Sequence, residues 1–446
     1  MLNYSKLYPF SFSILLQLYV FYIWFTLDLN NPFYFLELNF FYFQIEFFLD
    51  TLSLLFLFLT TFIINCCFLY NWNIQTTYQI EYFYCLLAVE IILFFIFSTT
   101  NLLIFYIFFE AILIPFFLLI GIVGYNKRKV HASFLLFFYT FFGSLLMLLG
   151  IIYLYLQQGS FQNFYFFEWN SNLNSKYYLW WCFFISFAIK IPVFPFHLWL
   201  PEAHVESPTE GSVILAGILL KLGTYGLCRF LFFLFPSTSF YYSTIVLVLC
   251  CLGVIYTSLM ALRQIDIKKI IAYSSVGHMN FCTIGLFSFN YYSLQGSIFM
   301  MIGHGVISSC LFFLIGMIYQ RYHTKLIYHY SGLCYSMPFY YFFFFIFMFS
   351  NISFPMTVNF VSEFLILIGI FVSNYVTAFI CCLFSLFLGV LYNLYMFNKI
   401  FFGLPNKKSY TYTIDLTLEE TLICSILLFF NLLLGVYPSI FLNWIT

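Results

Sequence analysis

Apolar stretches of about twenty residues recur along the whole sequence, and this repetition constrains the fold more than any motif does. An α-helix rises about 1.5 Å per residue, so about twenty residues cross the roughly 30 Å hydrocarbon core of a bilayer. Of the 446 residues, 64% are hydrophobic and only 7% are charged, which is too few charges for a surface that faces water. The chain is therefore predicted to be an integral membrane protein.

Hydropathy predicts about thirteen membrane spans. They are expected at residues 8–27, 47–70, 79–98, 101–123, 131–156, 178–200, 209–234, 241–262, 265–288, 293–319, 338–372, 374–402 and 417–443. The spans of a transmembrane β-barrel alternate in polarity over about ten residues, whereas these runs are continuously apolar and about twice as long. The predicted fold is an all-α polytopic membrane protein.

Charge and cysteine usage exclude several classes of function. The 16 basic and 16 acidic residues balance, so the chain lacks the basic stripe that nucleic-acid binding needs. The 13 cysteines lie mostly within apolar segments, and pairs such as Cys66 and Cys67 are adjacent instead of spaced as CxxC. This pattern argues against a zinc site, an iron–sulfur site and a disulfide framework. Because GxGxxG and P-loop motifs are also missing, no cofactor and no nucleic acid are expected to bind this chain.

The distribution of basic residues predicts the orientation in the membrane. Twelve of the 16 fall at the N-terminus or in the connections after even-numbered spans: Lys6, Lys127, Arg128, Lys129, Arg263, Lys268, Lys269, Arg321, Lys325, Lys399, Lys407 and Lys408. The positive-inside rule places this side in the cytoplasm or mitochondrial matrix. The N-terminus is then expected inside and the C-terminus outside.

Prolines interrupt the sixth and the eleventh predicted spans in the same way. The sixth contains Phe194-Pro195 within AIKIPVFPFHLWLP, and the eleventh contains Phe354-Pro355 within SNISFPMTVNFVSEF. Proline removes a backbone donor and breaks a helix, which leaves carbonyls that neighbours or water must satisfy. Each break is therefore predicted to be a hydrated spot.

The two interruptions indicate an internal repeat. Each lies in the fourth helix of a block of five, at residues 79–234 and 241–402, and an odd number of helices gives the two blocks opposite orientations. Inverted repeats with ion sites at broken helices are typical of transporters. The remaining segments are N-terminal helices within residues 1–78 and a C-terminal helix within residues 403–446.

Five ionisable residues are expected near the middle of their spans. A charge at that depth costs about 2.5 to 3.5 kcal/mol, so such residues are rare and usually functional. They are Glu110, Lys190, Lys221, His304 and Glu363, with His278 as a tentative sixth member. A row of titratable groups at similar depth needs only connecting water to carry protons, which predicts proton translocation.

A structural interpretation competes with the functional one for several of these residues. Glu110 and Lys190 are also compatible with a static ion pair, and His304 with a core histidine bonded to a carbonyl. Lys221 lies about twelve residues from either end of its span, which is too deep for its ammonium to reach the interface. Asp50, at a span end, and Glu90, which lacks a surrounding motif, are interpreted as structural.

Four stretches resemble a known family. Residues 105–124, 190–226 (KIPVFPFHLWLPEAHVESPTEGSVILAGILLKLGTYG), 262–281 and 303–316 resemble the fourth membrane subunits of mitochondrial NADH:ubiquinone oxidoreductase, respiratory complex I. The resemblance covers roughly residues 80–440, and the second stretch is specific to the antiporter-like superfamily. It implies a proton-pumping core subunit in the mitochondrial inner membrane, driven by electron transfer in other subunits. Those subunits would hold NADH, FMN, the iron–sulfur clusters and ubiquinone.

The resemblance also implies roles for individual residues. Glu110 would pair with Lys190, Lys221 would pass the proton on, and His304 would belong to a central hydrophilic axis that Glu363 closes. Sister subunits and cation/proton antiporters usually carry lysine at the position of Glu363, so this glutamate favours the fourth subunit. Moving Glu110 toward or away from Lys190 would switch the lysine between its charged and neutral forms.

The resemblance further implies partners and one departure. The expected partners are the other membrane subunits of the complex, with a sister antiporter-like subunit on either side, and membrane lipids. The family usually has fourteen spans, so this chain is expected to lack the first one, which agrees with an N-terminus on the matrix side. Two alternatives stay open: a free-standing cation/proton antiporter, and a structural membrane subunit without transport.

Overall fold

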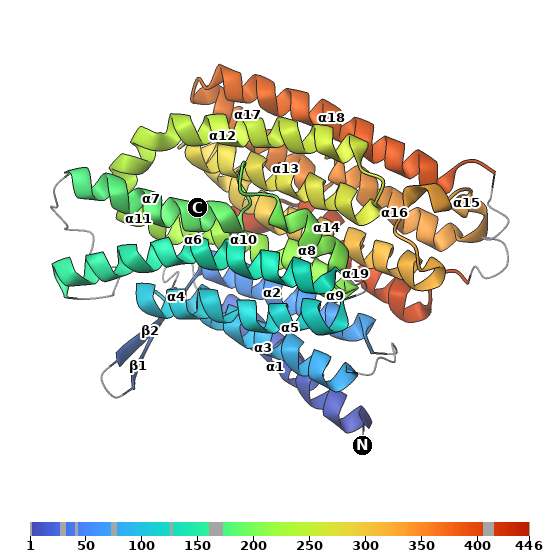
Figure 1. Ribbon diagram of the computed structural model, residues 1–446, viewed down its shortest axis with the longest axis horizontal. Helices are drawn as coiled ribbons and strands as arrows, with labels where there is room; N and C mark the ends of the chain where they lie inside the picture. The colour runs from blue at the N-terminus through green and yellow to red at the C-terminus, as the bar shows by residue number, and fades with distance from the viewer. Residues whose placement is uncertain are drawn as a thin grey trace.

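The computed structural model describes residues 2–26, 33–40, 43–72, 78–124, 128–159, 173–404 and 414–445. Long helices lie side by side through most of this part of the chain (Figure 1). Eleven of the described helical segments are long and apolar enough to cross a bilayer. The predicted polytopic helical fold is therefore confirmed, although Lys127, Lys407 and Lys408 of the orientation argument lie outside the described residues.

Nine of these segments are single helices. They are α1 (Leu2–Thr26), α2 (Thr51–Tyr70), α3 (Gln79–Ser98), α6 (Lys129–Gln158), α12 (Pro236–Arg263), α13 (Ile267–Phe287), α14 (Tyr291–Tyr322), α18 (Val376–Phe401) and α19 (Leu418–Val436). A tenth consists of α4 (Leu102–Ala111) and α5 (Leu113–Val123), which follow each other almost without interruption. Two short segments, η4 (Ile327–His329) and α15 (Leu333–Ser336), connect α14 to the next span.

A β-hairpin precedes α2 in this otherwise helical fold, so the second span begins later than the predicted residue 47. Strands β1 (Phe33–Phe40) and β2 (Phe43–Asp50) pair antiparallel. Their sequences, FYFLELNF and FQIEFFLD, place polar residues at every second position in part of each run, which is a strand pattern. The helix begins only at Thr51, because Asp50 accepts a hydrogen bond from the backbone N–H of Ser53 at 2.9 Å and acts as its N-cap.

The sixth and eleventh spans are broken at the predicted places and are not continuous helices. The sixth consists of α7 (Leu173–Lys190), turns over residues 191–198, and α8 (Trp199–Glu206). The eleventh consists of α16 (Pro338–Asn351), turns over residues 352–357, and α17 (Val358–Val372). We call these turns the first and the second break. Each follows a helix whose last residue is polar, Lys190 in one case and Asn351 in the other.

The thirteenth span is shorter than predicted. Helix α19 ends at Val436, and α20 (Ser439–Ile445) follows as a separate helix, so the predicted run over 417–443 is not one helix. The cause is Pro438, which disfavours helical geometry at Tyr437 and has no N–H to continue the helix.

The seventh span contains two π-helical segments that hydropathy does not reveal. It runs through α9 (Thr209–Ile214), η2 (Leu215–Leu219), α10 (Leu220–Gly226), η3 (Leu227–Leu231) and α11 (Phe232–Leu234). Here η2 and η3 have π geometry, and they flank the short helix α10 that carries Lys221. Single π turns within α-helices are frequent at functional sites.

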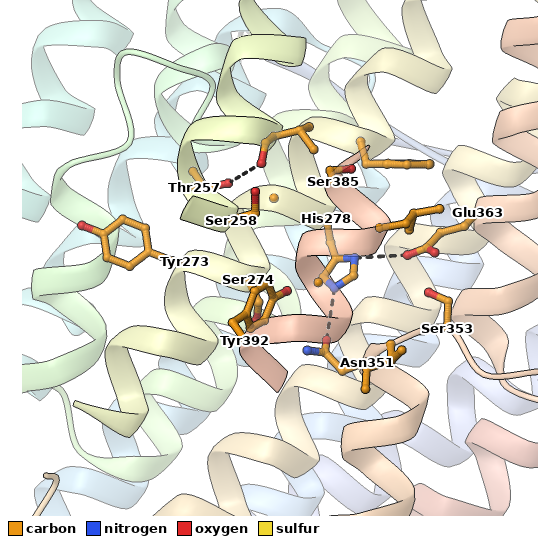
Figure 2. Close-up of a pocket in the computed structure, with 16 residues that line it drawn as sticks. Thr257, Ser258, Tyr273, Ser274, His278, Asn351, Ser353, Glu363, Ser385 and Tyr392 are labelled. Atoms are coloured by element: carbon orange, nitrogen blue, oxygen red, sulfur yellow. Dashed lines mark hydrogen bonds and ion pairs between the residues drawn. The ribbon is translucent and has the colours of Figure 1, made fainter. Parts of the chain in front are cut away.

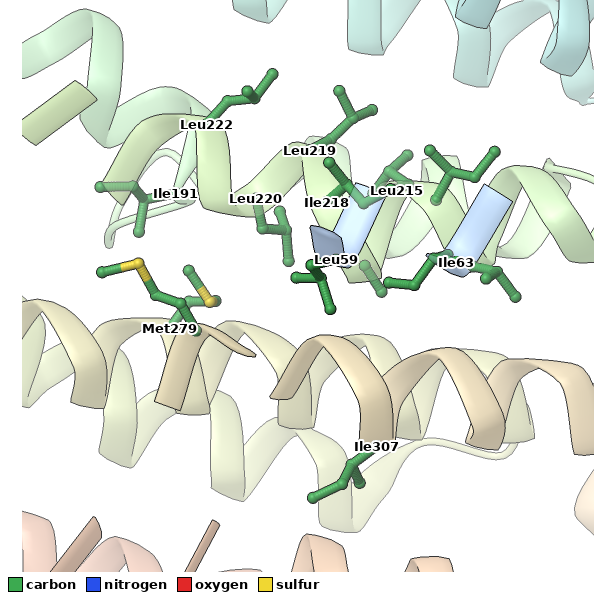
Figure 3. Packing of buried hydrophobic residues seen from close by; sticks show 14 of the residues in the cluster. Leu59, Ile63, Ile191, Leu215, Ile218, Leu219, Leu220, Leu222, Met279 and Ile307 are labelled. Carbon is green, nitrogen blue, oxygen red and sulfur yellow. The ribbon is translucent and has the colours of Figure 1, made fainter. Parts of the chain in front are cut away.

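Helix α14 forms the centre of the bundle. All residues of its membrane-spanning stretch are buried (100%), whereas the buried shares are 22% in α1 and 33% in α18. Figure 3 shows Leu59 and Ile63 of α2 beside Leu215 of η2 and Leu220 of α10, with Ile307 of α14 below them. Glycines permit this close packing: a Cβ on Gly305 would meet the carbonyl oxygen of Gly217 at 3.2 Å.

Candidate functional site

Lys221 and His304 contact each other directly at the centre of the bundle. The ammonium Nζ of Lys221 lies 2.9 Å from Nδ1 of His304, and it also donates to the carbonyl oxygen of Ala216 in η2. Both side chains are buried, with exposed fractions of 0% and 2%. The structure thus brings together two residues that the sequence only placed at similar depth.

His278 of α13 continues this contact to the second break. Its ring centroid lies 5.6 Å from that of His304, and its Nδ1 is 3.3 Å from a carboxylate oxygen of Glu363. Its Nε2 is 3.2 Å from Oδ1 of Asn351, at the end of α16 (Figure 2). His278, tentative in the sequence, therefore lies between His304 and Glu363.

A small polar cavity lies beside Glu363 at the second break. Its volume is about 40 Å³, and a cavity needs about 10–15 Å³ to hold one water molecule. Hydroxyl groups from several helices line it: those of Thr257, Ser258, Ser274, Ser385 and Tyr392 (Figure 2). The site thus offers polar groups and enough room for water.

Glu110 and Lys190 are neighbours but do not form the direct pair that the resemblance implies. The ammonium of Lys190 donates to the carbonyl oxygen of Phe109 at 3.2 Å and lies 3.9 Å from the centroid of the Phe109 ring. The described residues contain no direct ion pair between Lys190 and Glu110, although the two charges interact electrostatically. Glu110 instead interacts with Ser144 of α6. Glu110 and Lys190 therefore do not form a direct ion pair that fixes their two helices together.

A second buried polar cluster was missed by the sequence reasoning. Lys268 donates to the carbonyl oxygen of Ser207 at 3.1 Å, and Glu210 accepts hydrogen bonds from Thr209 at 2.7 Å and Tyr82 at 2.8 Å. Lys268 was assigned to a connection between spans, but α13 begins at Ile267, so Lys268 lies in its first turn and is fully buried. The acidic residues within PEAHVESPTEG were the feature of the sequence from which this cluster could have been predicted.

The cluster adjoins an open cavity at one end of the bundle, which we call the vestibule. The vestibule has a volume of about 440 Å³ and is lined by Arg128, Glu202, Val205, Glu206, Asp266, Lys269, Tyr319, His323 and Lys325. Burial lowers the pKa of the Lys325 ammonium, and the carboxylates of Glu206 and Asp266 oppose this effect. The connections after the fourth, eighth and tenth spans meet here, so basic residues that the sequence assigned to one side share one face.

His204 lies between the buried cluster and Lys221. Its ring stacks on that of Phe312 with centroids 4.6 Å apart, and neither ring nitrogen has a hydrogen-bond partner in the described structure. Its electrostatic neighbours are Lys268 and Lys221. A buried imidazole with both nitrogens unpaired is unusual in a folded protein.

The two acidic residues interpreted as structural lie away from this row. Asp50 forms an ion pair with Arg229 at 2.5 Å, where β2 meets the end of the seventh span. Glu90 is buried in α3, and its two carboxylate oxygens have no hydrogen-bond partner in the described structure. Among the described residues, no group of three or more His, Cys, Asp or Glu side chains is arranged to hold a metal ion.

Comparison with known proteins identifies the family. A family described as "NADH:quinone oxidoreductase/Mrp antiporter, TM" matches residues 99–389, a range that contains all six predicted site residues. NADH-ubiquinone oxidoreductase chain 4 of Acanthamoeba castellanii is 44% identical over 404 residues, which cover 89% of this chain and 80% of that protein. The chain belongs to the chain 4 family of NADH-ubiquinone oxidoreductases. The Arabidopsis thaliana chain 4 protein is 42% identical over 404 residues, covering 90% of this chain and 81% of its own length.

Solved structures place the chain 4 fold in multisubunit complexes. A chain of respiratory complex I from Thermus thermophilus with bound NADH superposes with a TM-score of 0.89 at 26% identity, covering 100% of this chain and 97% of that chain. A chain of the Mrp complex from Dietzia sp. DQ12-45-1b superposes with a TM-score of 0.88 at 19% identity, covering 99% and 91%, which shows a shared fold. This member of the chain 4 family is thus a membrane subunit of a larger complex.

Proposed function

We propose that this chain translocates protons across the mitochondrial inner membrane as a core subunit of NADH:ubiquinone oxidoreductase. The observation that carries the proposal is the 2.9 Å contact between Lys221 and His304, which extends through His278 to Glu363. Buried titratable groups at the centre of a membrane protein are costly, and those that occur usually have a function. The proposed proton path consists of Glu110, Lys190, Lys221, His304, His278 and Glu363.

The inner part of this path needs only short transfers. A proton on Lys221 reaches Nδ1 of His304 across an existing contact, and His304 then has its second ring nitrogen to release one. His278 receives it across a ring separation of 5.6 Å, through one intervening water or a ring rotation, and passes it to Glu363 at 3.3 Å. The cavity beside Glu363 supplies room for the water that continues the path.

The outer part begins at Lys190. Glu110 is close enough to Lys190 for the two charges to attract each other, but they do not form a direct ion pair. A small movement of either helix therefore changes this attraction and switches the lysine between its charged and neutral forms. A proton released from Lys190 has Lys221 as its next acceptor. The membrane potential opposes outward transfer by about 2.3 kcal/mol per charge per 100 mV, so this switch has to be driven.

The proposal extends to cofactors, partners and orientation. Electron transfer supplies the driving energy, and NADH, FMN, the iron–sulfur clusters and ubiquinone bind in other subunits. Sister antiporter-like subunits pack on either side of this chain. The N-terminus and the vestibule face the matrix, the C-terminus faces the intermembrane space, and residues 79–234 and 241–402 form the two inverted repeats.

A free-standing cation/proton antiporter is the second candidate, because the Mrp complex shares the fold. Native-gel mass spectrometry of solubilised membranes separates the two. We expect the chain to migrate with flavin and iron–sulfur subunits. Migration of the whole population without any flavin or iron–sulfur subunit would refute membership in the oxidoreductase and favour the antiporter.

A further inference from the structure

Asn280 of α13 contacts the backbone of the first break. Its amide Nδ2 donates to the carbonyl oxygen of Pro192 at 3.3 Å and to that of Val276, one turn earlier in α13, at 2.8 Å. The side chain is fully buried, and the Pro192 carbonyl lies only two residues beyond Lys190. An element of the second repeat thus holds the chain of the first repeat next to a proposed proton carrier.

The Pro192 carbonyl is available because the helix is broken there. In a continuous helix it would accept the N–H of Phe196, but that N–H donates to the carbonyl oxygen of Val193 at 2.7 Å. A carbonyl freed within a membrane needs a replacement donor from a neighbouring element. The indole N–H of Trp199 donates to the carbonyl oxygen of Ile189 in this way at 3.0 Å, and the amide of Asn280 donates to that of Pro192.

Space for Asn280 is provided by Gly253 of α12. A Cβ at Gly253 would lie 2.9 Å from Oδ1 of Asn280, which is closer than real Cβ contacts, and a tight 3.0 Å from its Cγ. The absence of a side chain at Gly253 and the amide at Asn280 therefore fit each other. The packing of the Asn280 amide against Gly253 holds the amide beside the break. This contact is separate from the two hydrogen bonds that the amide donates.

Two residues earlier, the same helix contacts the two helices that flank the second break. His278 lies 3.2 Å from Asn351 and 3.3 Å from Glu363, whereas Asn280 faces Pro192. Two residues turn an α-helix by about 200°, so the two side chains point to opposite sides of α13. Helix α13 is therefore attached to the first break and, two residues away, to both helices that flank the second.

We propose that Asn280 is a positioning residue that couples the two broken helices through α13. By holding the chain beyond Lys190, it fixes the position of the first break relative to His278, so a rearrangement at one break is passed to the other. The amide itself carries no proton. This role rests on the proposed function, because it matters only if protons move between the two breaks.

The test uses the assembled complex in membrane vesicles and compares Asn280→Ala, Gly253→Ala and the double variant. The measurement is the rate of NADH-driven proton uptake per assembled complex, with assembly measured on native gels. For each single variant we expect a loss of about fivefold, the change in equilibrium that one ordinary hydrogen bond brings. Asn65→Ala, which removes a buried amide bonded to Ser13 and Gln17, is the matched control and should pump normally.

The double variant separates positioning from packing. Asn280→Ala removes the atoms with which a methyl group at Gly253 would collide, so a packing role predicts that the double variant recovers. A positioning role predicts that it stays as slow as Asn280→Ala, because the bond to Pro192 is still missing. Recovery of pumping in the double variant would overturn the proposal, and so would normal pumping by Asn280→Ala. If Asn280→Ala fails to assemble, normal pumping by Gly253→Ala would overturn it. If Lys221→Met loses pumping while Asn280→Ala pumps normally, the proposed function stands and only the role of Asn280 fails. Normal pumping by Lys221→Met would remove the basis of the proposed function.

Discussion

The Nζ atom of Lys221 lies 2.9 Å from Nδ1 of His304, and the same ammonium donates to the carbonyl oxygen of Ala216. A charged lysine has three donors and no acceptor, so His304 must offer a lone pair at Nδ1 when Lys221 is protonated. The two groups are thus arranged to hold one proton between them. A second proton would place two positive charges in contact inside the membrane, which is strongly unfavourable.

The first prediction concerns this lysine. Lys221→Met keeps the approximate shape of the side chain and removes a buried charge, so we expect the complex to assemble. Proton pumping should fall by about a hundredfold or more, the scale on which one acid–base group contributes, and NADH oxidation should slow with it. The measurement is protons moved per NADH oxidised in vesicles. Normal pumping in fully assembled variant would remove Lys221 from the path.

The second prediction compares two buried glutamates. Glu363→Gln should impair proton movement, because Glu363 contacts His278 and lines the polar cavity at the second break. Glu90→Gln should have a milder effect, because Glu90 lies in α3 without a hydrogen-bonded or charged partner among the described residues. Both variants are compared at equal assembly by initial pumping rates. A larger defect in Glu90→Gln would show that the proposed path omits a helix.

The third prediction tests orientation with two conservative changes. Ser331, between η4 and α15, and Ser373, between α17 and α18, are both half-exposed and lie on opposite sides of the membrane in the proposed topology. After the native thiols are blocked, Ser331→Cys should react with an impermeant reagent from the matrix side and Ser373→Cys from the intermembrane side. Reaction of both from the same side would invalidate the span count.

The fourth prediction concerns packing at the second break. A Cβ on Gly435 of α19 would lie 2.1 Å from the carbonyl oxygen of Met356, whereas a Cβ on Gly121 of α5 would meet nothing nearer than 3.8 Å. Overpacking of this kind costs about 1–3 kcal/mol, so Gly435→Ala should reduce the amount of assembled complex on native gels. Gly121→Ala is the matched change and should assemble normally. Equal assembly of the two variants would mean that the backbone of the second break moves to accommodate the added methyl group.

Hydropathy and proline positions predicted the spans and both breaks because these features depend on local composition. The hairpin before α2 was missed because its apolar residues merged with the helix that follows, although the alternation around Glu37 and Glu46 was visible. The π segments beside Lys221 had no signal in the sequence, because they differ from an α-helix only in which backbone groups pair.

The candidate residues were predictable by type and depth, but their contacts were not. That Lys190 bonds to the carbonyl of Phe109 instead of the carboxylate of Glu110 depends on how α7 and α4 are rotated against each other. His204 and Asn280 were missed for a related reason. Each lies in a recognised stretch, but only the packing of distant helices shows that one nears Lys221 and the other reaches Pro192.

The burial of the membrane-spanning stretch of α14 has a consequence for the effect of lipid composition. Hydrophobic mismatch tilts and shifts helices whose surfaces touch lipid, at a fraction of a kcal/mol per Å of thickness difference. The window that spans the membrane is only 22% buried in α1 but 100% buried in α14, so a thicker or thinner bilayer acts on the outer helices and not directly on the central one. We therefore expect His304 to keep its depth when the lipids around the protein change.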